Sequence, residues 1–322
     1  MSEKNIKNSK FKKIVLSILI IFVILISGIV ISLTYFNSKI NKLEIDRNFV
    51  TNTGLTPVEE ANNVITVALL GSDYSGNEFG ASDATMILSI DTKNKNIKLC
   101  SLMRDIYLDL PDGSGKQNLN YTMVDGGPEL LLKTINYNFN LKIDKFIHVS
   151  LETLPSIIDA LGGIDIEITN EELKLINGYI GNIDKENGTS TQPLNGSGLQ
   201  HLNGTQAAAY CRIRYTEGRD YKRTERQRYV LDSIFTKFNT ISIGELPALV
   251  NKLLPFVSTN LTTAEMISIG TTALKSGITN IEQGRFPLDE HHTTEWTDMY
   301  HMIIDKEATT NELHKFIYSV KN

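Results

Sequence analysis

The sequence predicts an α/β protein in which strands and helices alternate along the chain and pack in layers. Short apolar runs rich in β-branched residues and bounded by turn residues are typical of buried strands. Segments between them carry leucine and isoleucine at helical spacing. A hydrophobic content of 41% and a charged content of 21% describe a globular protein. This alternation favours a layered α/β domain.

The first half of this domain supplies the clearest elements. Strands are expected over residues 64–73, 84–91, 97–105, 145–151 and 164–168. A helix is expected over 126–139, because Pro128 suits a first turn and apolar residues recur behind it at helical spacing. Residues 154–163 predict a second helix that glycines stop.

The second half is predicted to be mainly helical. Residues 177–200 are rich in Gly, Asn, Ser and Thr, which predicts a long surface loop that could serve as a lid. Helices are expected over 229–238 and 246–257. Two capping-box patterns mark further helix starts, Thr262-x-x-Glu265 and Thr309-x-x-Glu312. We find no internal repeat and no second domain.

The N-terminus contains the most apolar segment of the chain. Residues 14–36 carry no charge, and about 20 apolar residues suffice to cross a bilayer. Five lysines precede them, so the positive-inside rule predicts a cytoplasmic tail at 1–13. A cleaved signal peptide is the alternative, but no small-x-small site follows. We expect a single-pass signal anchor in the cell membrane, a polar linker at 37–61 and an extracytoplasmic domain at 62–322.

Arginine is distributed unevenly along this chain. Six of its nine arginines lie between Cys211 and Arg228, and lysine supplies most other positive charge. The net charge of −5 disfavours a nucleic-acid partner. Arginine differs from lysine in presenting a planar fork that grips carboxylate or phosphate with two hydrogen bonds. The cluster therefore predicts an anion site.

Two local patterns would bring arginines together. If residues 209–214 are extended, Arg212 and Arg214 project from the same face. Arg223 and Arg226 have helical spacing with Gln227 beside them, and Asp220 can cap their helix. Arg219 and Arg228 fall off these faces and are expected to reach solvent. The alternative is a helix surface of salt bridges to Glu217, Asp220 and Glu225.

A pair of aspartates and a further arginine stand at predicted strand ends. Arg104 follows a buried strand, and ligands of open α/β sheets gather at such ends. Asp73 and Asp83 lie on the two sides of one loop. Two carboxylates placed so can share Mg²⁺, whose other positions water and substrate phosphates fill. Together these residues predict a diphosphate site, in which cation and guanidiniums neutralise the leaving phosphate.

Seven segments of the sequence resemble the LytR-CpsA-Psr proteins of bacterial cell envelopes. In family order they are VALLGSD, SDATMILSID, SLMRDIYLDLP, NLNYTMVDGG, IDALGGIDIEI, LNGTQAAAYCRIR and DYKRTERQ, and they are spread over roughly residues 64–230. The sequence departs from the family pattern at three positions. Ala81 replaces an arginine, Met103 replaces a proline, and Asn118 takes the place of a basic residue for which Lys116 could substitute.

The resemblance implies a membrane-anchored phosphotransferase with a mixed central sheet between helices. Such enzymes move a glycopolymer, of the teichoic acid or capsular polysaccharide type, from a polyprenyl-pyrophosphate carrier in the membrane to peptidoglycan, forming a phosphodiester. It implies Mg²⁺ or Mn²⁺ at Asp73 and Asp83, which with Arg104 would be catalytic. The implied pyrophosphate contacts are Arg104, Arg212, Arg214, Arg223, Arg226 and Gln227. The implied lining of a lipid tunnel is Leu131, Leu132, Ile135 and Ile158, for which ordinary core packing is the alternative.

Two other functions fit the same residues. One is a hydrolase of polyprenyl pyrophosphate, because water can replace the sugar hydroxyl as acceptor. The other is a non-catalytic envelope regulator or wall-binding protein. Cys100 and Cys211 are expected to be buried free thiols, with a disulfide between them as the alternative.

Overall fold

The computed structural model describes residues 38, 41–46, 63–75, 78–91, 93–150, 152–216, 219–240, 245–275 and 281–318. The chain divides into two units, residues 1–40 and residues 41–322, and nearly all described residues belong to the second. The predicted tail at 1–13 and anchor at 14–36 lie outside the described residues. Within the described ranges, no helix combines the length and apolar character that a membrane span requires.

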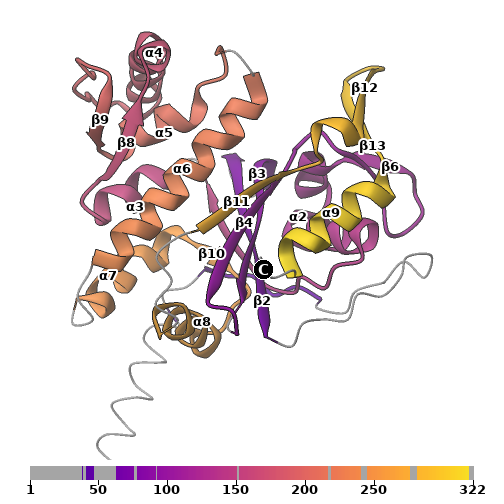
Figure 1. Cartoon of the computed structure of the whole chain (residues 1–322). Coiled ribbons are helices and arrows are strands. Elements are labelled where there is room, and N and C mark those ends of the chain that lie inside the picture. Colours follow the sequence, from indigo (N-terminus) through magenta and orange to yellow (C-terminus); the bar gives the residue numbers. More distant parts are fainter. Residues whose placement is uncertain are drawn as a thin grey trace, which may run out of the picture. The chain divides into compact units, whose positions relative to one another are not determined.

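A seven-stranded mixed sheet forms the centre of the second unit (Figure 1). Its strands, in spatial order, are β1 (Asn41–Lys42), β10 (Ser258–Thr259), β7 (Phe146–Ser150), β2 (Val64–Ser75), β3 (Glu78–Asp91), β4 (Asn96–Leu102) and β11 (Ile281–Phe286). β3 is antiparallel to both β2 and β4, whereas β7 is parallel to β2 and β11 is parallel to β4. The mixed sheet implied by the family resemblance is confirmed.

Buried apolar residues explain why the three central strands pair in this register. Ala68 faces Ile87, and Ile87 faces Cys100, so each strand contributes to one buried row. Between β2 and β3 the register shifts on both sides of Ser72. Such bulges bend a strand and re-aim its side chains, here at the strand end that carries Asp73.

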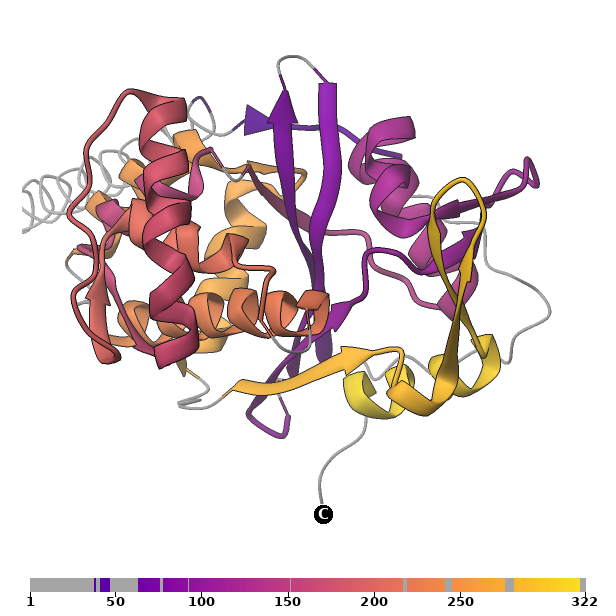
Figure 2. The ribbon, with the colours of Figure 1, turned by 90° about the horizontal axis from the view of Figure 1, so that it is seen from above.

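Helices cover both faces of the sheet (Figure 2). On one face lie α2 (Leu119–Phe139) and α9 (Lys306–Tyr318), and on the other lie α3 (Leu154–Ala160), α5 (Gly204–Arg212) and α6 (Arg219–Thr240). The remaining helices are α4 (Asn170–Asn187), α7 (Leu246–Leu253) and α8 (Thr263–Lys275). The layered α/β architecture predicted from the sequence is therefore confirmed.

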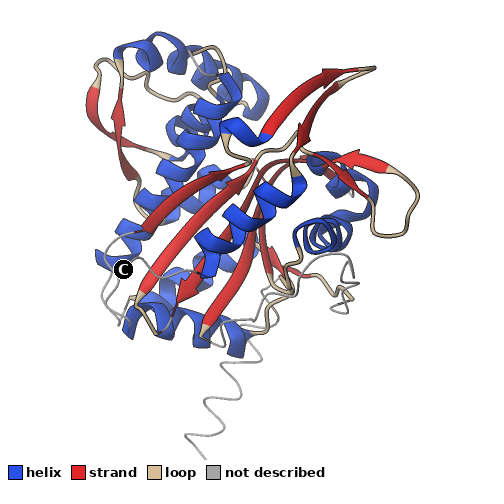
Figure 3. Cartoon of the chain, turned by 45° about the vertical axis from the view of Figure 1, so that its right-hand side comes forward, coloured by secondary structure: helices blue, strands red, loops and turns tan. Residues whose placement is uncertain are grey.

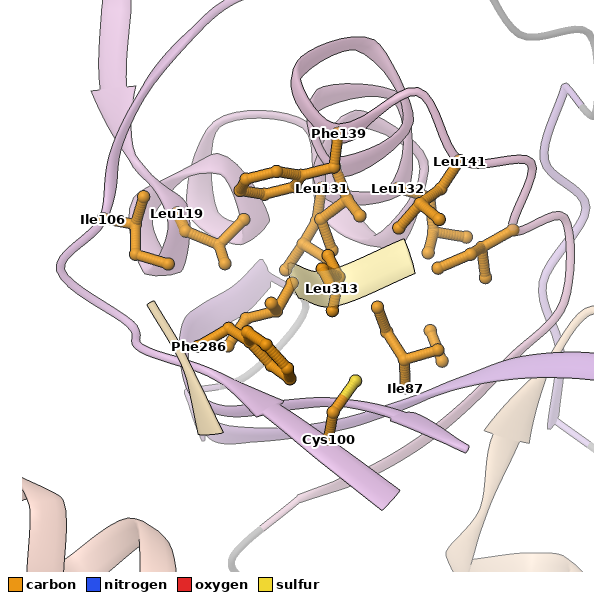
Figure 4. Packing of buried hydrophobic residues seen from close by; sticks show 14 of the residues in the cluster. Ile87, Cys100, Ile106, Leu119, Leu131, Leu132, Phe139, Leu141, Phe286 and Leu313 are labelled. Atoms are coloured by element: carbon orange, nitrogen blue, oxygen red, sulfur yellow. The ribbon is translucent and has the colours of Figure 1, made fainter. Parts of the chain in front are cut away.

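The larger core lies between the sheet and α2 with α9 (Figure 4). Leu131, Leu132 and Ile135 of α2 are fully buried there beside Ile87 and Leu313. Burying each such side chain stabilises the fold by about 1.5–3 kcal/mol. The predicted helix at 126–139 is the second part of α2, which Gly126 and Gly127 interrupt with non-helical backbone angles.

A second core joins α3, α4 and α5 to a hairpin of β8 (Ile164–Ile168) and β9 (Gly198–Leu202). The sequence prediction of a loop over 177–200 is wrong for its first half, because α4 continues to Asn187. Thr169 and Glu172 form a capping box at the start of α4. Its buried residues are Glu172, Ile176, Ile180 and Ile183. Burial of this isoleucine stripe holds the helix despite its two glycines.

The prediction of an extended segment at 209–214 is also wrong. Asn203 and Gln206 form a capping box that starts α5, and the helix runs to Arg212. Ile213, the residue after the helix, has extended backbone. Arg212 therefore ends a helix while Arg214 lies beyond it, and the two do not share a strand face.

Short hairpins flank the sheet (Figure 3). They pair β5 (Tyr107–Asp109) with β6 (Lys116–Asn118), and β12 (His292–Trp296) with β13 (Tyr300–Ile304). Two 3₁₀ turns, η1 (Leu254–Phe256) and η2 (Asp289–His291), complete the elements. α9 starts three residues before the predicted Thr309.

The described part of the predicted linker contacts the domain. Within the segment 37–61, Asn41 and Lys42 form β1, which pairs with β10 at the edge of the sheet. Leu43 and Ile45 pack against the larger core. Residues 41–46 therefore belong structurally to the domain rather than to a free tether.

Candidate active site

Three arginines converge on the carboxylate of Asp83 in β3. Arg104 Nη1 lies 2.6 Å from Oδ1 of Asp83, and Arg214 Nη2 lies 3.1 Å from Oδ2. Arg223 Nη1 lies 3.5 Å from the same Oδ2. The side chain of Asp83 is only 9% exposed. Residues far apart in the sequence thus form one cluster, here called the Asp83 cluster (Arg104, Arg214, Arg223 and Asp83).

Backbone contacts fix where each arginine starts. Arg104 follows β4, and its carbonyl accepts a hydrogen bond from the Asn120 amide at 2.9 Å, which ties it to the first turn of α2. The Arg214 amide donates to the Tyr179 hydroxyl of α4 at 3.2 Å. Arg223 extends from the beginning of α6 and is 2% exposed. Sheet, loop and helix therefore each deliver one guanidinium.

The cluster keeps Asp83 ionised. Burial alone would raise the pKa of Asp83, but the charges of Arg223, Arg104 and Arg214 and the hydrogen bond from Arg104 bring it below its ordinary value. Asp105 is the second carboxylate nearby, 3.4 Å from Arg104 Nε. Among the described side chains, the site therefore joins three guanidiniums to two carboxylates.

Arg214 is the arginine of the cluster best able to meet a ligand. Its side chain is 48% exposed, and its one side-chain hydrogen bond within the described residues goes to Asp83. A guanidinium carries five N–H donors, so most of those of Arg214 face solvent. The positive charge and the open donors of Arg214 suit an oxyanion such as a phosphate.

Asp73 lies next to this cluster along the sheet. Its backbone belongs to β2, whereas its side chain lies outside the described part of the structure. Ser72 of β2 pairs with Ser82 of β3. Asp73 and Asp83 each follow one member of this cross-strand pair, so the backbone brings both predicted metal ligands to adjacent strands.

A buried polar pair that the sequence did not predict supports this strand end. Ser72 Oγ lies 2.8 Å from His148 Nε2, and both side chains are buried. Burial lowers the pKa of His148 to about 4, so its ring is neutral near pH 7. The only hint in the sequence is a histidine within an otherwise apolar predicted strand.

Arg226 and Gln227 do not reach Asp83. Arg226 Nε lies 2.7 Å from Glu172, Nη1 donates to the Ile213 carbonyl at 3.1 Å, and Nη2 donates to Thr216 Oγ1 at 2.7 Å. These contacts bracket Arg214 on both sides. Gln227 is buried, and its Oε1 has no hydrogen-bond partner within the described residues.

The other arginines of the sequence cluster also lie elsewhere. Arg212 Nη1 is 3.0 Å from Glu186 of α4. Arg228, expected in solvent, is instead buried and donates to Ser101 Oγ at 3.1 Å, because α6 packs this face against β4. The side chain of Arg219 lies outside the described residues.

The predicted tunnel residues fall into two different cores. Leu131, Leu132 and Ile135 pack together beside α9, whereas Ile158 belongs to the core of α4 and α5. All four are fully buried, which agrees with ordinary core packing.

The two cysteines, Cys100 and Cys211, are free and buried, and burial raises the pKa of each thiol to about 12.

The described donors fit a hard cation that takes few protein ligands. The ionised carboxylate of Asp83 is an oxygen ligand of the kind Mg²⁺ prefers. The described residues hold no group of three or more His, Cys, Asp or Glu side chains suited to a metal. A cation at Asp83 would therefore need substrate phosphates or water to complete its coordination.

Comparison with known proteins places this geometry in context. The profile of the LytR_cpsA_psr family matches residues 31–315. The polyisoprenyl-teichoic acid–peptidoglycan teichoic acid transferase TagU of Bacillus mycoides (strain KBAB4) is 28% identical over 325 residues, covering 96% of this chain and 99% of that protein. The regulatory protein MsrR of Staphylococcus aureus (strain COL) is 29% identical over 207 residues, covering 64% of this chain and 59% of that protein.

Solved structures share the fold at low sequence identity. TagT bound to LIIa-WTA superposes with a TM-score of 0.65 at 19% identity, over 86% of this chain and all of that one. The YwtF (TagT) protein with bound octaprenyl pyrophosphate lipid gives a TM-score of 0.61, also at 19% identity and with the same coverage. These similarities support the fold described above.

Proposed function

Because the chain belongs to the LytR_cpsA_psr family, we propose that it transfers a glycopolymer phosphate from a polyprenyl-pyrophosphate carrier to peptidoglycan. The observation that carries the proposal is the convergence of Arg104, Arg214 and Arg223 on Asp83. Relatives support the substrate class, since one is named a teichoic acid transferase and a structure of the same fold holds octaprenyl pyrophosphate.

In this mechanism the Asp83 cluster binds the pyrophosphate. Guanidinium forks match phosphate oxygens geometrically, and their positive charge offsets that of the anion. Arg214, with its open donors, would make the first contact. Arg104 and Arg223, held on Asp83, offer fixed charge that needs no reorganisation when negative charge develops.

The transfer step then balances as a displacement at phosphorus. A sugar hydroxyl of peptidoglycan forms a bond to the phosphorus that carries the glycan. The bond from that phosphorus to the bridging oxygen breaks, and polyprenyl phosphate leaves with the electron pair. Asp73 would accept the hydroxyl proton, because the arginines around Asp83 lower the pKa of that carboxyl and occupy its oxygens. The arginines stabilise the charge on the departing phosphate.

Mg²⁺, or Mn²⁺ in its place, is part of the proposal. Asp73 and Asp83 would hold the ion, which would supply further neutralisation of the phosphate oxygens. The ionised state of Asp83 supports this assignment.

Two arginines take supporting roles in the proposal. Arg226 is a positioning residue, since its hydrogen bonds to Ile213 and Thr216 hold the segment that carries Arg214. Arg212 would contact the pyrophosphate only after leaving Glu186.

The location of the protein is also proposed from the sequence. An anchor at 14–36 would keep the domain at the outer face of the cell membrane, beside its lipid-linked donor.

One experiment separates this function from its alternatives. Full-length protein in detergent receives purified polyprenyl-linked glycan and Mg²⁺, with or without peptidoglycan, and the products are identified. The proposal expects a glycan–peptidoglycan phosphodiester and polyprenyl phosphate. Equal release of glycan phosphate without peptidoglycan would indicate the hydrolase.

A regulator is the other candidate, because the relative MsrR is named a regulatory protein. Absence of any product with all components present would favour that candidate. Arg214→Ala is the control that should lose activity. Its exposed side chain is a proposed pyrophosphate contact and can be removed without opening the core.

A further inference from the structure

A cavity of about 370 Å³ lies between β8, the beginning of α4, α5 and α6. Carboxylates dominate its lining: Asp165, Glu167, Glu172, Glu225 and Asp232. The two lining cations are Lys222 and Arg226. The cavity is thus negatively charged, although it shares Arg226 with the segment that supports Arg214.

Three of these carboxylates already have partners. Arg226 pairs with Glu172 at 2.7 Å, Lys222 pairs with Glu225 at 2.6 Å, and His201 Nδ1 lies 2.7 Å from Asp165. Glu167 and Asp232 have no cationic partner within the described residues. Burial raises the pKa of Asp232, which is the response of a carboxylate without a nearby counter-charge.

Tyr210 gives independent evidence of a ligand. Its side chain lines the cavity although the residue is only 2% exposed. Its hydroxyl has no hydrogen-bond partner within the described part of the chain. Burial raises the pKa of Tyr210, so the hydroxyl stays protonated and keeps an acceptor lone pair. The hydroxyl is thus open to a ligand that enters the cavity.

We propose that this cavity binds an organic ammonium group, such as a free amine of a peptide or of an unacylated amino sugar. An ammonium carries one positive charge and three donors, which Asp232, Glu167 and the Tyr210 hydroxyl can accept. A metal ion fits less well, because the cavity's carboxylates are not among any metal-binding group of three in the described residues.

The test uses a matched pair of probes on the full-length protein without lipid donor. Nα-acetyl-lysine methylamide carries the ammonium, and its Nε-acetylated form has the same backbone without the charge. Calorimetry should show the charged probe binding at least about tenfold more tightly, the effect of one charge-assisted hydrogen bond. Equal affinity for both probes would overturn the proposal.

Variants tie any binding to this cavity. Asp232→Asn and Tyr210→Phe should each weaken the charged probe about fivefold to tenfold, since each removes one contact at nearly constant volume. Glu295→Gln, at an exposed carboxylate of β12, should change nothing. Unchanged affinity in both cavity variants, with thermal melting confirming that they fold, would also overturn the proposal.

Two further arms complete the design. In one arm, Ca²⁺ is added to the wild type and to Asp232→Asn. If Ca²⁺ abolishes probe binding in the wild type and binds Asp232→Asn more weakly, the cavity is a metal site and the proposal is contradicted. Comparing a free-amine muropeptide with glucosamine distinguishes a peptide source of the ammonium from a sugar source. Because no lipid donor is present, failure here leaves the transferase proposal untouched.

Discussion

Arg104 donates a hydrogen bond from Nη1 to Oδ1 of Asp83 over 2.6 Å, linking the end of β4 to β3. The opposite oxygen of that carboxylate receives Arg214 from 131 residues further along the chain. One buried acid therefore organises guanidiniums from separate elements. This arrangement sets the geometry of the anion site before any ligand arrives, which is what electrostatic preorganisation requires.

Arg104→Lys should reduce transfer about a hundredfold, because an ammonium cannot reproduce the planar fork at the phosphate and losing one preorganised donor commonly costs this much. The rate is measured with purified lipid-linked donor. Arg285→Lys is the matched control: Arg285 pairs with Asp289 outside the cluster, and its variant should stay within about twofold. Similar rates for both variants would remove Arg104 from the site.

Asp83→Asn should lower the free energy of unfolding by about 3 kcal/mol at pH 7, since it removes the buried carboxylate that faces Arg104, Arg214 and Arg223. Folding lowers the pKa of Asp83, so its stabilisation is complete above its unfolded pKa near 3.8. It is lost as pH falls through the lowered folded pKa. Denaturant titrations of both proteins should therefore converge in strong acid, and a constant difference at all pH values would contradict this account.

Glu172→Gln should cost about 3 kcal/mol of stability and reduce transfer as well, because it strands Arg226, which holds the segment around Arg214. The exposed Glu171 of the same helix provides the control, and Glu171→Gln should be nearly silent. Loss of stability with a fully preserved rate would show that Arg226 does not position Arg214.

His148 should make stability depend on pH in a defined window. Its folded pKa of about 4 lies below the ordinary 6.5, so the unfolded chain binds a proton first as pH falls. The free energy of unfolding therefore falls by about 3 kcal/mol between pH 6.5 and 4. His148→Gln should flatten the unfolding free energy across that window. An unchanged slope in His148→Gln would refute the assignment.

Removal of divalent metal should stop transfer. We expect chelation by EDTA to reduce product to background and added Mg²⁺ or Mn²⁺ to restore it, because the proposed ion offsets phosphate charge. Asp73→Ala should not be restored at the same metal concentration. Full activity in EDTA would exclude the proposed ion at Asp73 and Asp83.

The sequence predicted the members of the Asp83 cluster better than it predicted the residues that hold them in place. Arginine is scarce in this chain, so its concentration at 212–228 and its presence at Arg104 were informative. Arg226 could not be separated from Arg223 in this way. The direction of the Arg226 side chain depends on Glu172, which comes close to it only when the beginning of α4 lies beside α6 in the fold.

Local composition misled the prediction at two helices. Gly178 and Gly181 each weaken a helix by about 1 kcal/mol, yet burial of Ile176, Ile180 and Ile183 outweighs them in α4. For α5 the Asn203-x-x-Gln206 capping pattern was visible in the sequence. The strands β11, β12 and β13 were missed because short, half-exposed strands depend on their tertiary partners.

The central claim is that the Asp83 cluster grips the pyrophosphate of a lipid-linked donor. The most direct measurement compares the affinity of wild type and Arg214→Ala for a short-chain polyprenyl pyrophosphate. Loss of one charge-assisted contact should weaken binding about tenfold or more while thermal melting stays unchanged. Equal affinity of the two proteins would contradict the claim.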